Sequence, residues 1–276
     1  MKVRTHRLLA TPYIVWMAIF IIVPLLITLY YSFTTIDGGF SWENYQKFFD
    51  PIYLGVLWRS LKIAFVCTVF CLLIGYPLAM ILTSSEFIRK KWLMFLCILP
   101  MWMNMLLRTY AWMTLLEKQG IINIILGWFG VEPIQMLYTS GAVYLGLIYN
   151  FLPFMILPIY SVMLKIDRGL IEAAEDLGAN RFQVFRKVIL PKSMPGVITG
   201  ITMVFMPAVT TFVISRLLGG GQYTMIGNLI EKQFVESGNW YFGSAISILM
   251  MVLILLSMYI MKLAGGSKED VGGGLF

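Results

Sequence analysis

The stretch DRGLIEAAEDLGANRFQVFRKVILPKSMPG, Asp167–Gly196, is a polar island between two long apolar runs, and the rest of the chain is organised around it. Asp167 can accept hydrogen bonds from the free backbone N–H groups at the start of a helix. Gly178 suits the left-handed conformation in which such a helix ends, because glycine adopts that conformation without strain. These two residues predict a short first helix.

A second helix is predicted immediately after the first. Asn180, with Gln183 three residues later, has the form of a capping box, in which each side chain bonds the other residue's backbone N–H. Pro191 and Pro195 are expected to close this helix and to fix the entry to the next apolar run. The stretch therefore predicts two short helices at an angle, lying across the mouth of a membrane protein.

The composition of the chain indicates that its solvent is lipid. The 276 residues are 59% hydrophobic and 13% charged, with a mean hydropathy of +0.81, whereas soluble domains are about a quarter charged. Six apolar runs reach the roughly 20 residues that cross a bilayer, and an unpaired backbone in hydrocarbon requires them to be helical. The fold class predicted is an all-α polytopic membrane protein with six transmembrane helices, approximately Thr11–Thr34, Ser60–Thr83, Trp92–Leu116, Gly141–Leu164, Val197–Leu218 and Tyr241–Lys262.

The net charge of +7 could suggest a nucleic-acid partner, but its distribution indicates membrane topology instead. With the N-terminus inside, the predicted cytoplasmic segments hold most of the basic residues, while the acidic residues divide evenly. This asymmetry is the positive-inside rule, and it places both termini in the cytoplasm. The predicted organisation is a cytoplasmic segment at 1–10, a membrane domain at 11–264 that includes the polar loop at 165–196, and a disordered glycine-rich tail at 265–276.

The sequence offers little catalytic or metal chemistry of its own. His6 is the only histidine, so neither a His-based metal site nor a His-dependent triad is available. Cys67, Cys71 and Cys97 all fall within apolar spans, where packing is the expected role. Phosphate-loop and HExxH patterns are absent from the sequence. We therefore expect no cofactor in this chain, and any energy it uses must come from another subunit.

The third predicted span is the most polar in its middle and outer half. Pro100 is expected to break its hydrogen-bond ladder, and Asn104 lies near mid-membrane. Arg108 follows one turn later, and its simplest interpretation is a side chain that extends to the outer face and pairs with a neighbour or a lipid headgroup. The alternative is a functional site, because ionisable groups within a membrane often serve one.

At this point the residues match a known pattern. Glu172-Ala173-Ala174, then Gly178, then Val188-x-Leu190-Pro191 resembles the EAA loop of ATP-binding-cassette (ABC) importer permeases. The family pattern is EAA, three residues, Gly, nine residues, Ile, one residue and Leu-Pro, and the chain departs from it only at Val188. The spacing, the predicted inner-face location and the six-span topology agree independently.

Longer stretches are similar to the PotB-type permeases of spermidine/putrescine importers, namely those at 146–179, 217–234 and 239–247. The resemblance implies a type I importer (MetI-like) fold in the bacterial cytoplasmic membrane. It also implies several partners: a related second permease (PotC-type), two cytoplasmic ATPase subunits (PotA-type) that bind ATP and Mg, and an extracytoplasmic polyamine-binding protein (PotD-type). The positions that it assigns to coupling with the ATPase are Glu172, Ala173, Ala174, Gly178, Arg181 and Pro191.

A polyamine carries several positive charges and needs acids or aromatic faces in transit. Two acids near the predicted outer mouth and three aromatic residues are candidates for the substrate path, although each could equally pack at an interface: Glu231, Glu236, Trp112, Tyr149 and Phe212. Arg108 and Arg216 are expected to point away from such a path or to pair with these acids.

Three other functions stay open on the sequence alone. The nearest is an ABC importer permease of the same architecture for an anion, a metal chelate or an amino acid. A secondary transporter is less favoured, because it would need intramembrane carboxylates and the apolar spans hold none at mid-depth. A membrane-embedded enzyme is weaker still, for want of a nucleophile and its base.

Overall fold

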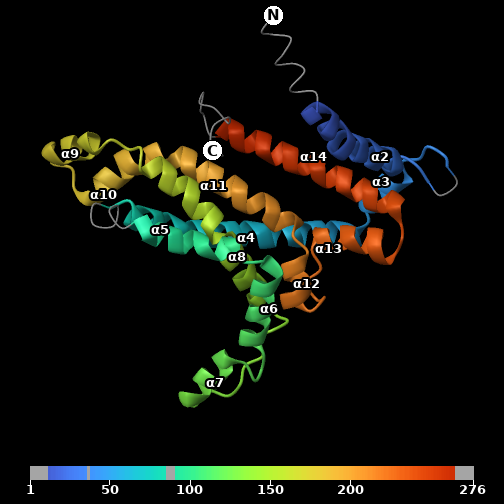
Figure 1. Cartoon of the computed structure of the whole chain (residues 1–276), viewed down its shortest axis with the longest axis horizontal. Coiled ribbons are helices and arrows are strands. Elements are labelled where there is room, and N and C mark those ends of the chain that lie inside the picture. The colour runs from blue at the N-terminus through green and yellow to red at the C-terminus, as the bar shows by residue number, and fades with distance from the viewer. Residues whose placement is uncertain (1–11, 36–37, 85–90, 265–276) are drawn as a thin grey trace, which may run out of the picture. The chain divides into compact units, whose positions relative to one another are not determined.

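A computed structural model describes residues 12–35, 38–84 and 91–264 of the chain. The predicted terminal segments at 1–10 and 265–276 lie outside these residues. Within the described ranges the backbone is helical apart from loops and one isolated β-bridge between Thr34 and Phe40, which agrees with the predicted all-α class. The chain divides into two compact units, a smaller one of Met1–Gly55 with Leu229–Leu255 and a larger one of Val56–Asn228 with Leu256–Phe276 (Figure 1).

The smaller unit contains the first membrane helix, Pro12–Ser32, whose second half is α2 (Val23–Ser32). The short helix α3 (Glu43–Phe48) follows, and most of α14 (Trp240–Ala264) belongs to the same unit. Between α2 and α3, four aromatic rings pack with centroid distances of 5.0–6.2 Å; they belong to Phe33, Phe40, Trp42 and Tyr45. Tyr45 anchors this cluster by donating its hydroxyl to Ser32 Oγ at 2.8 Å.

The larger unit holds the remaining helices, and α4 and α13 continue into the smaller one. Their bounds are α4 (Pro51–Leu82), α5 (Lys91–Ile98), α6 (Met105–Leu116), α7 (Ile121–Trp128), α8 (Ser140–Met163), α9 (Arg168–Asp176), α10 (Arg181–Val184), α11 (Leu190–Thr210), α12 (Val213–Gly219) and α13 (Ile226–Glu231). Five helices in the described ranges are long and apolar enough to cross a membrane, or six when one bent pair is counted as a span.

The central packing of the larger unit is the antiparallel pair α8 and α11, which lie side by side (Figure 1). Two glycines on α11 allow their close approach. A Cβ on Gly196 would lie 2.8 Å from the Pro158 carbonyl oxygen, and one on Gly200 would lie 2.7 Å from Met155 Sδ. The two small residues therefore allow close helix contact, and Met155 and Ile159 are completely buried in it.

The second helix of the polar stretch does not end at its prolines, so that prediction was wrong. One unbroken helix runs from Arg181 to Thr210 and carries Pro191 and Pro195 in its interior. A π-helical turn at Phe185–Ile189 precedes Pro191, with Leu190 N–H donating to the Phe185 carbonyl. A wider turn relieves the clash between the proline ring and the preceding carbonyl, so the helix continues.

The third predicted span, Trp92–Leu116, is not a straight helix. Helices at Trp92–Trp102 and Met105–Trp128 meet at a bend of 92°. The predicted break at Pro100 is confirmed, because Leu99–Trp102 is a 3₁₀ turn and Met103 is extended. Asn104 then starts a new helix by accepting a hydrogen bond from Leu106 N–H at 2.8 Å.

The fifth predicted span, Val197–Leu218, is also interrupted. Helix α11 ends at Thr210, Thr211 is extended, and α12 begins at Val213. Thr211 N–H still donates to the Pro207 carbonyl at 2.9 Å. The sequence did not reveal this break, because apolar residues continue through it. Such breaks at membrane depth require other groups to satisfy the freed carbonyls.

Candidate functional site: a capped helical hairpin and a clasped helix break

The hairpin formed by α9 and α10 begins and ends at the predicted residues. Asp167 Oδ1 accepts a hydrogen bond from Gly169 N–H at 2.9 Å. Gly178 has φ +81° and ends α9 in the left-handed conformation. Since a side chain at that φ would be strained, the glycine fixes the direction in which the chain leaves α9.

Helix α10 opens with a complete capping box. Asn180 Oδ1 accepts from Gln183 N–H, Gln183 Oε1 accepts from Asn180 N–H, and both distances are 2.9 Å. The backbone donors at the start of both helices are therefore satisfied within the hairpin. Because α10 continues into α11, a force applied to the hairpin is transmitted directly to a membrane-crossing helix.

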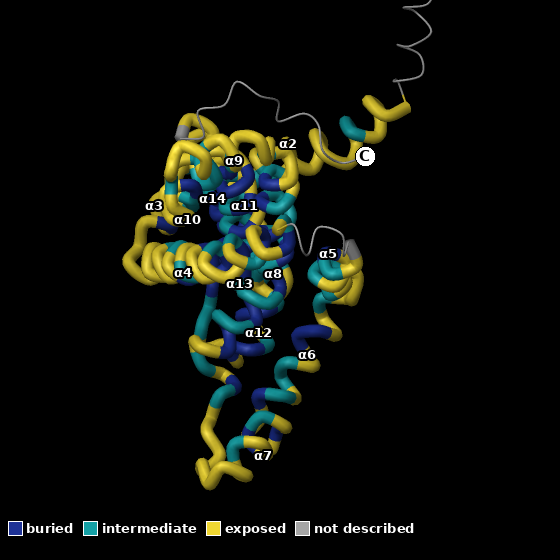
Figure 2. The backbone as a smooth tube through the Cα atoms, turned by 90° about the vertical axis from the view of Figure 1, so that its left-hand side faces the viewer, coloured by how far each residue is buried: buried dark blue, intermediate teal, exposed yellow. Residues whose placement is uncertain are grey.

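The hairpin exposes apolar side chains instead of burying them. Leu177 is 89% exposed, Phe182 is 68% exposed, and Leu170 is also exposed. Figure 2 shows α9 exposed along nearly its whole length. Large apolar side chains that are exposed together on one element are typical of a surface that contacts another protein or a membrane.

Five of the six predicted coupling residues lie together in this hairpin. Glu172, Ala173 and Arg181 are exposed, Ala174 is half-buried, and Gly178 forms the turn. Pro191 is exposed too, but it lies beyond the π-helical turn in the continuous helix. The structure thus gives these residues a shared surface, while their coupling role stays a prediction.

The other end of the α8–α11 pair carries α12 and, further along, α7 (Figures 1 and 2). Here Asn228 closes the break between α11 and α12. Its Nδ2 donates to the Phe212 carbonyl at 2.8 Å, and its Oδ1 accepts from Ser215 Oγ at 2.6 Å and from Met225 N–H at 3.0 Å. Gly227 packs directly against the Thr210 carbonyl, where a Cβ would clash. We call this arrangement the Asn228 clasp.

Sequence reasoning missed the Asn228 clasp. The signal available was the pair Gly227-Asn228 in an otherwise apolar run, since glycine permits close backbone approach and asparagine can both donate and accept. The clasp is tied to α4 as well, because Ile226 N–H donates to the buried Ser60 Oγ at 2.8 Å. These bonds supply partners for backbone groups that the broken helix leaves free.

The predicted substrate-path residues are only partly brought together. Trp112 on α6 and Tyr149 on α8 form an edge-to-face pair with ring centroids 5.3 Å apart. Phe212 lies exposed at the break before α12. Glu231 and Glu236 belong to the smaller unit, and the role of all five residues in a path stays a prediction.

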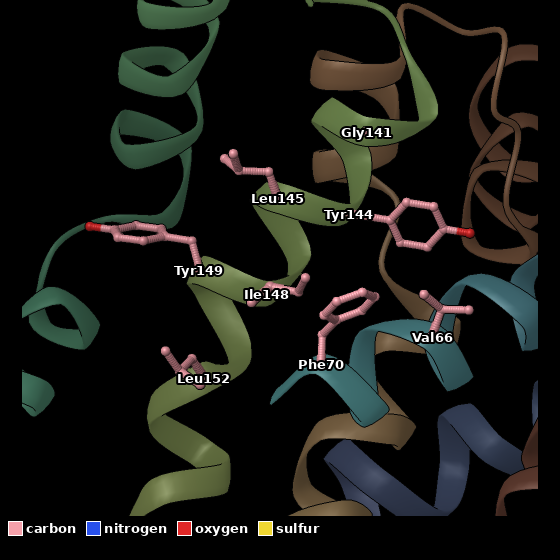
Figure 3. A pocket seen from close by; sticks show the side chains of 8 residues that line it. All are labelled: Val66, Phe70, Gly141, Tyr144, Leu145, Ile148, Tyr149 and Leu152. Carbon is pink, nitrogen blue, oxygen red and sulfur yellow. The ribbon is translucent and has the colours of Figure 1, made fainter. Parts of the chain in front are cut away.

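A cavity of about 550 Å³ lies beside Tyr149, between α4 and α8 (Figure 3). Its walls are apolar apart from two tyrosines, and its lining residues are Val66, Phe70, Gly141, Tyr144, Leu145, Ile148, Tyr149 and Leu152. In Figure 3 the ring of Tyr149 points away from Phe70 and Val66. The lining carries no charged group, so its aromatic rings are the groups in it that can interact with a cation.

Arg108 does not extend outward, and that expectation was wrong. Its side chain is only 8% exposed, and neither Nε nor Nη1 has a hydrogen-bond partner in the described part of the chain. The physical reason is the bend at Met103 and Asn104: it reorients α6 so that the first-turn residues Arg108 and Thr109 are buried. Sequence position within an assumed straight span could not reveal this.

The chain matches the family described as "Binding-protein-dependent transport system inner membrane component" over residues 72–265, which is more than half of its length. It therefore belongs to this family, and it is a multi-pass protein of the bacterial cytoplasmic membrane. It is also 44% identical over 253 residues to "Spermidine/putrescine transport system permease protein PotB" of Haemophilus influenzae, covering 89% of this chain and 88% of that one.

Two further similarities agree with this membership. The protein of the same description from Escherichia coli is 39% identical over 253 residues, covering 89% of this chain and 92% of that one. A solved structure, "Crystal structure of bacterial alginate ABC transporter in complex with alginate pentasaccharide-bound periplasmic protein", has a chain with a TM-score of 0.80 at 17% identity, covering 95% of this chain and 94% of that chain. The last similarity establishes the fold, and the fold is that of an ABC importer permease.

Proposed function

We propose that this chain is the permease subunit of an ATP-driven importer for polyamines such as spermidine and putrescine. The observation that carries the proposal is the hairpin of α9 and α10, whose backbone is capped and whose apolar side chains are exposed. Its resemblance to the EAA loop and the 44% identity to a relative named for spermidine/putrescine transport support the choice of energy source and substrate.

In this proposal the hairpin lies on the cytoplasmic side and docks into a partner ATPase, which binds ATP and Mg. Leu170, Leu177 and Phe182 would supply apolar contact, and burying each of them is worth about 1.5–3 kcal/mol. Glu172 and Arg181 would add charged contacts at the rim of the surface. Closure of two ATPase subunits would then move the hairpins of two permeases together.

The hairpin is covalently continuous with the two most closely packed membrane helices. Helix α8 ends at Met163, four residues before the Asp167 cap, and α10 continues into α11 without interruption. Close contacts at Gly196 and Gly200 hold α8 and α11 together. A displacement of the hairpin would therefore move this pair as one body and change access to a path at the opposite end.

We propose three kinds of partner: a related second permease, two ATPase subunits and an extracytoplasmic polyamine-binding protein. The family description names dependence on a binding protein. In the alginate transporter, a permease of this fold occurs in complex with a periplasmic protein. Both support an assembly in which this chain provides one half of the membrane path.

The test is to purify the assembled complex with its binding protein in lipid and to measure ATP hydrolysis. Spermidine and putrescine should stimulate hydrolysis, whereas an amino acid, an oxyanion and a metal chelate at equal concentration should not. Stimulation by one of the latter would show that the permease serves a different solute. Hydrolysis by this chain alone would contradict the proposal that a partner subunit hydrolyses the ATP.

A substitution at Glu172 tests whether the hairpin docks into the ATPase. Glu172→Ala should weaken association with the ATPase subunits, while Glu117→Ala, an exposed acid at the end of α6, should leave it unchanged. Wild-type association and coupled hydrolysis in the Glu172 variant would count against its docking role.

A further inference from the structure

In the described part of the larger unit, two buried side chains carry polar atoms that have no hydrogen-bond partner. The first is Arg108 on α6, whose Nε and Nη1 have no acceptor among the described residues. The second is Asn150 on α8, which is 3% exposed. Its Nδ2 donates to the Gly146 carbonyl at 2.8 Å, but its Oδ1 accepts no hydrogen bond within that same set of residues. Buried polar groups are nearly always paired, so both call for an explanation.

The two groups are chemically complementary. Arg108 supplies only donors, and Asn150 Oδ1 is an acceptor. A guanidinium held away from water without an acceptor is strongly destabilised, and a single buried acceptor costs less but still counts. A hydrogen bond between them would satisfy both at once.

The two helices that carry these side chains are also in contact. Trp112, one turn after Arg108 on α6, contacts the ring of Tyr149, which directly precedes Asn150 on α8. The α6–α8 contact therefore occurs within one helical turn of both unpaired groups. The long arginine side chain can cover such a separation with a modest movement of α6.

Helix α6 has a hinge that permits this movement. It begins at the 92° bend, where Met103 is extended and Asn104 caps the helix through Leu106 N–H. The cap belongs to α6 itself, so α6 can rotate about Met103 without losing its own first hydrogen bonds. Extended single residues between helices commonly absorb such changes.

We propose that Arg108 and Asn150 form a state-dependent hydrogen bond that fixes α6 against α8 in the alternative conformation of the transport cycle. Arg108 acts in this way as a positioning residue. The inference rests on the proposed function, because it requires two conformations driven by the ATPase. It adds a specific contact that forms in one of them and is open in the structure described above.

The first experiment measures the separation directly in the assembled complex. Cysteines replace Arg108 and Asn150 in a chain whose Cys67, Cys71 and Cys97 are changed to Ala, and a short bifunctional thiol reagent is applied. Cross-linking should rise about tenfold on going from the nucleotide-free to the nucleotide-trapped complex, or in the reverse direction, because one charge-assisted bond shifts a two-state equilibrium by that order. Equal yields in the two states would overturn the inference.

The second experiment keeps the arginine and strengthens its acceptor. Asn150→Asp turns the contact between a charged donor and a neutral acceptor into an ion pair between guanidinium and carboxylate, which is stronger. The paired state should then dominate, and polyamine uptake should fall about tenfold while the complex still assembles. Adding Arg108→Gln removes the charge and should restore most of the uptake.

Asn123 provides the matched control. It is a buried asparagine on α7 whose amide is fully engaged with Glu117 and Ile134. Asn123→Asp should lower complex yield, and Arg108→Gln should not rescue it. If Arg108→Gln restores function to both the Asn150→Asp and the Asn123→Asp variants, or to neither of two assembled variants, no specific Arg108–Asn150 pair exists.

These experiments distinguish a failure of the proposed function from a failure of the Arg108–Asn150 contact. If the wild-type complex shows no polyamine-stimulated hydrolysis, the proposed function fails before any variant is considered. If the wild type is stimulated but cross-linking is independent of state, only the Arg108–Asn150 contact is refuted. If Asn150→Asp fails to assemble, the cross-linking result alone decides.

Discussion

The two ends of the α8–α11 pair satisfy their hydrogen bonds and bury their side chains in opposite ways. At the α9–α10 hairpin, the caps of Asp167 and Asn180 pair the backbone donors at both helix starts, and Leu177 is left in solvent. Toward the α12 end, apolar side chains such as Ile214 and Leu218 are completely buried, but Arg108 and Asn150 have polar atoms without a partner among the described residues.

This difference separates two tasks. A hairpin with a rigid backbone and an uncovered apolar surface is suited to docking, because its shape is set before a partner arrives. A region with a sealed apolar core and unpaired polar groups is suited to changing conformation, because an alternative arrangement can satisfy those groups. The helix pair between them has to be stiff for one end to act on the other.

The largest effect on stability is expected at the close contact between α8 and α11. Gly196→Val would place a branched side chain against the Pro158 backbone carbonyl, which cannot yield. Overpacking typically costs about 1–3 kcal/mol, and contact with backbone on a spanning helix places this case at or above the upper end. The purified protein should lose thermal stability or fail to insert, as measured by detergent size-exclusion and a melting curve. Gly127→Val, where nothing lies within 4 Å of the added Cβ, should be nearly neutral.

A smaller but more specific effect is expected at the docking surface. Leu177→Ser removes an apolar contact worth about 1.5–3 kcal/mol, so ATPase affinity should fall roughly 10- to 100-fold. Folding should be unaffected, because the side chain is already in solvent. Affinity is measured by titrating the permease in nanodiscs with the ATPase subunits.

The matched control for Leu177 lies at the opposite end of the same unit. Phe129 is 80% exposed beside α7, so Phe129→Ser removes an equally exposed apolar side chain. It should leave ATPase affinity unchanged. If both variants lose the same ATPase affinity, the hairpin is not a specific docking surface.

The Asn228 clasp should show an intermediate effect on stability. Asn228→Ala removes one donated and two accepted hydrogen bonds, and leaving buried partners unpaired costs about 1–3 kcal/mol. The melting temperature should fall, and amide hydrogen exchange should rise around Thr210–Val213. Gln222→Ala changes an exposed loop residue and serves as the control. If amide exchange around Thr210–Val213 is no faster in the Asn228→Ala variant than in this control, the clasp is contradicted.

The smallest effect is expected from the hairpin's second cap. Asn180→Ala abolishes the capping box at a cost of about 1 kcal/mol. The result should be faster amide exchange at Gln183 and Val184 with little change in global stability, because α10 continues into a long packed helix. Asn180→Asp keeps the acceptor and should behave like the wild type, whereas fraying in that variant would point to a different role for Asn180.

The amino-acid sequence determined the local events of this structure. Asp167, Gly178, Asn180 and Gln183 act through bonds and dihedral angles within a few residues of themselves, so their roles were predictable and are confirmed. Apolar run length likewise predicted spanning helices, since lipid allows almost no other backbone.

The tertiary structure alone decided that Pro191 does not end its helix and where the buried polar groups lie. Pro191 lies within a continuous helix because a π-helical turn makes room for it, whereas the break at Pro100 was predictable from the sequence. The burial of Arg108 depends on helices that are distant in sequence, and the Asn228 clasp depends on a helix break that the apolar run did not reveal. A pattern of residues cannot show which of several low-cost backbone geometries those distant contacts will favour.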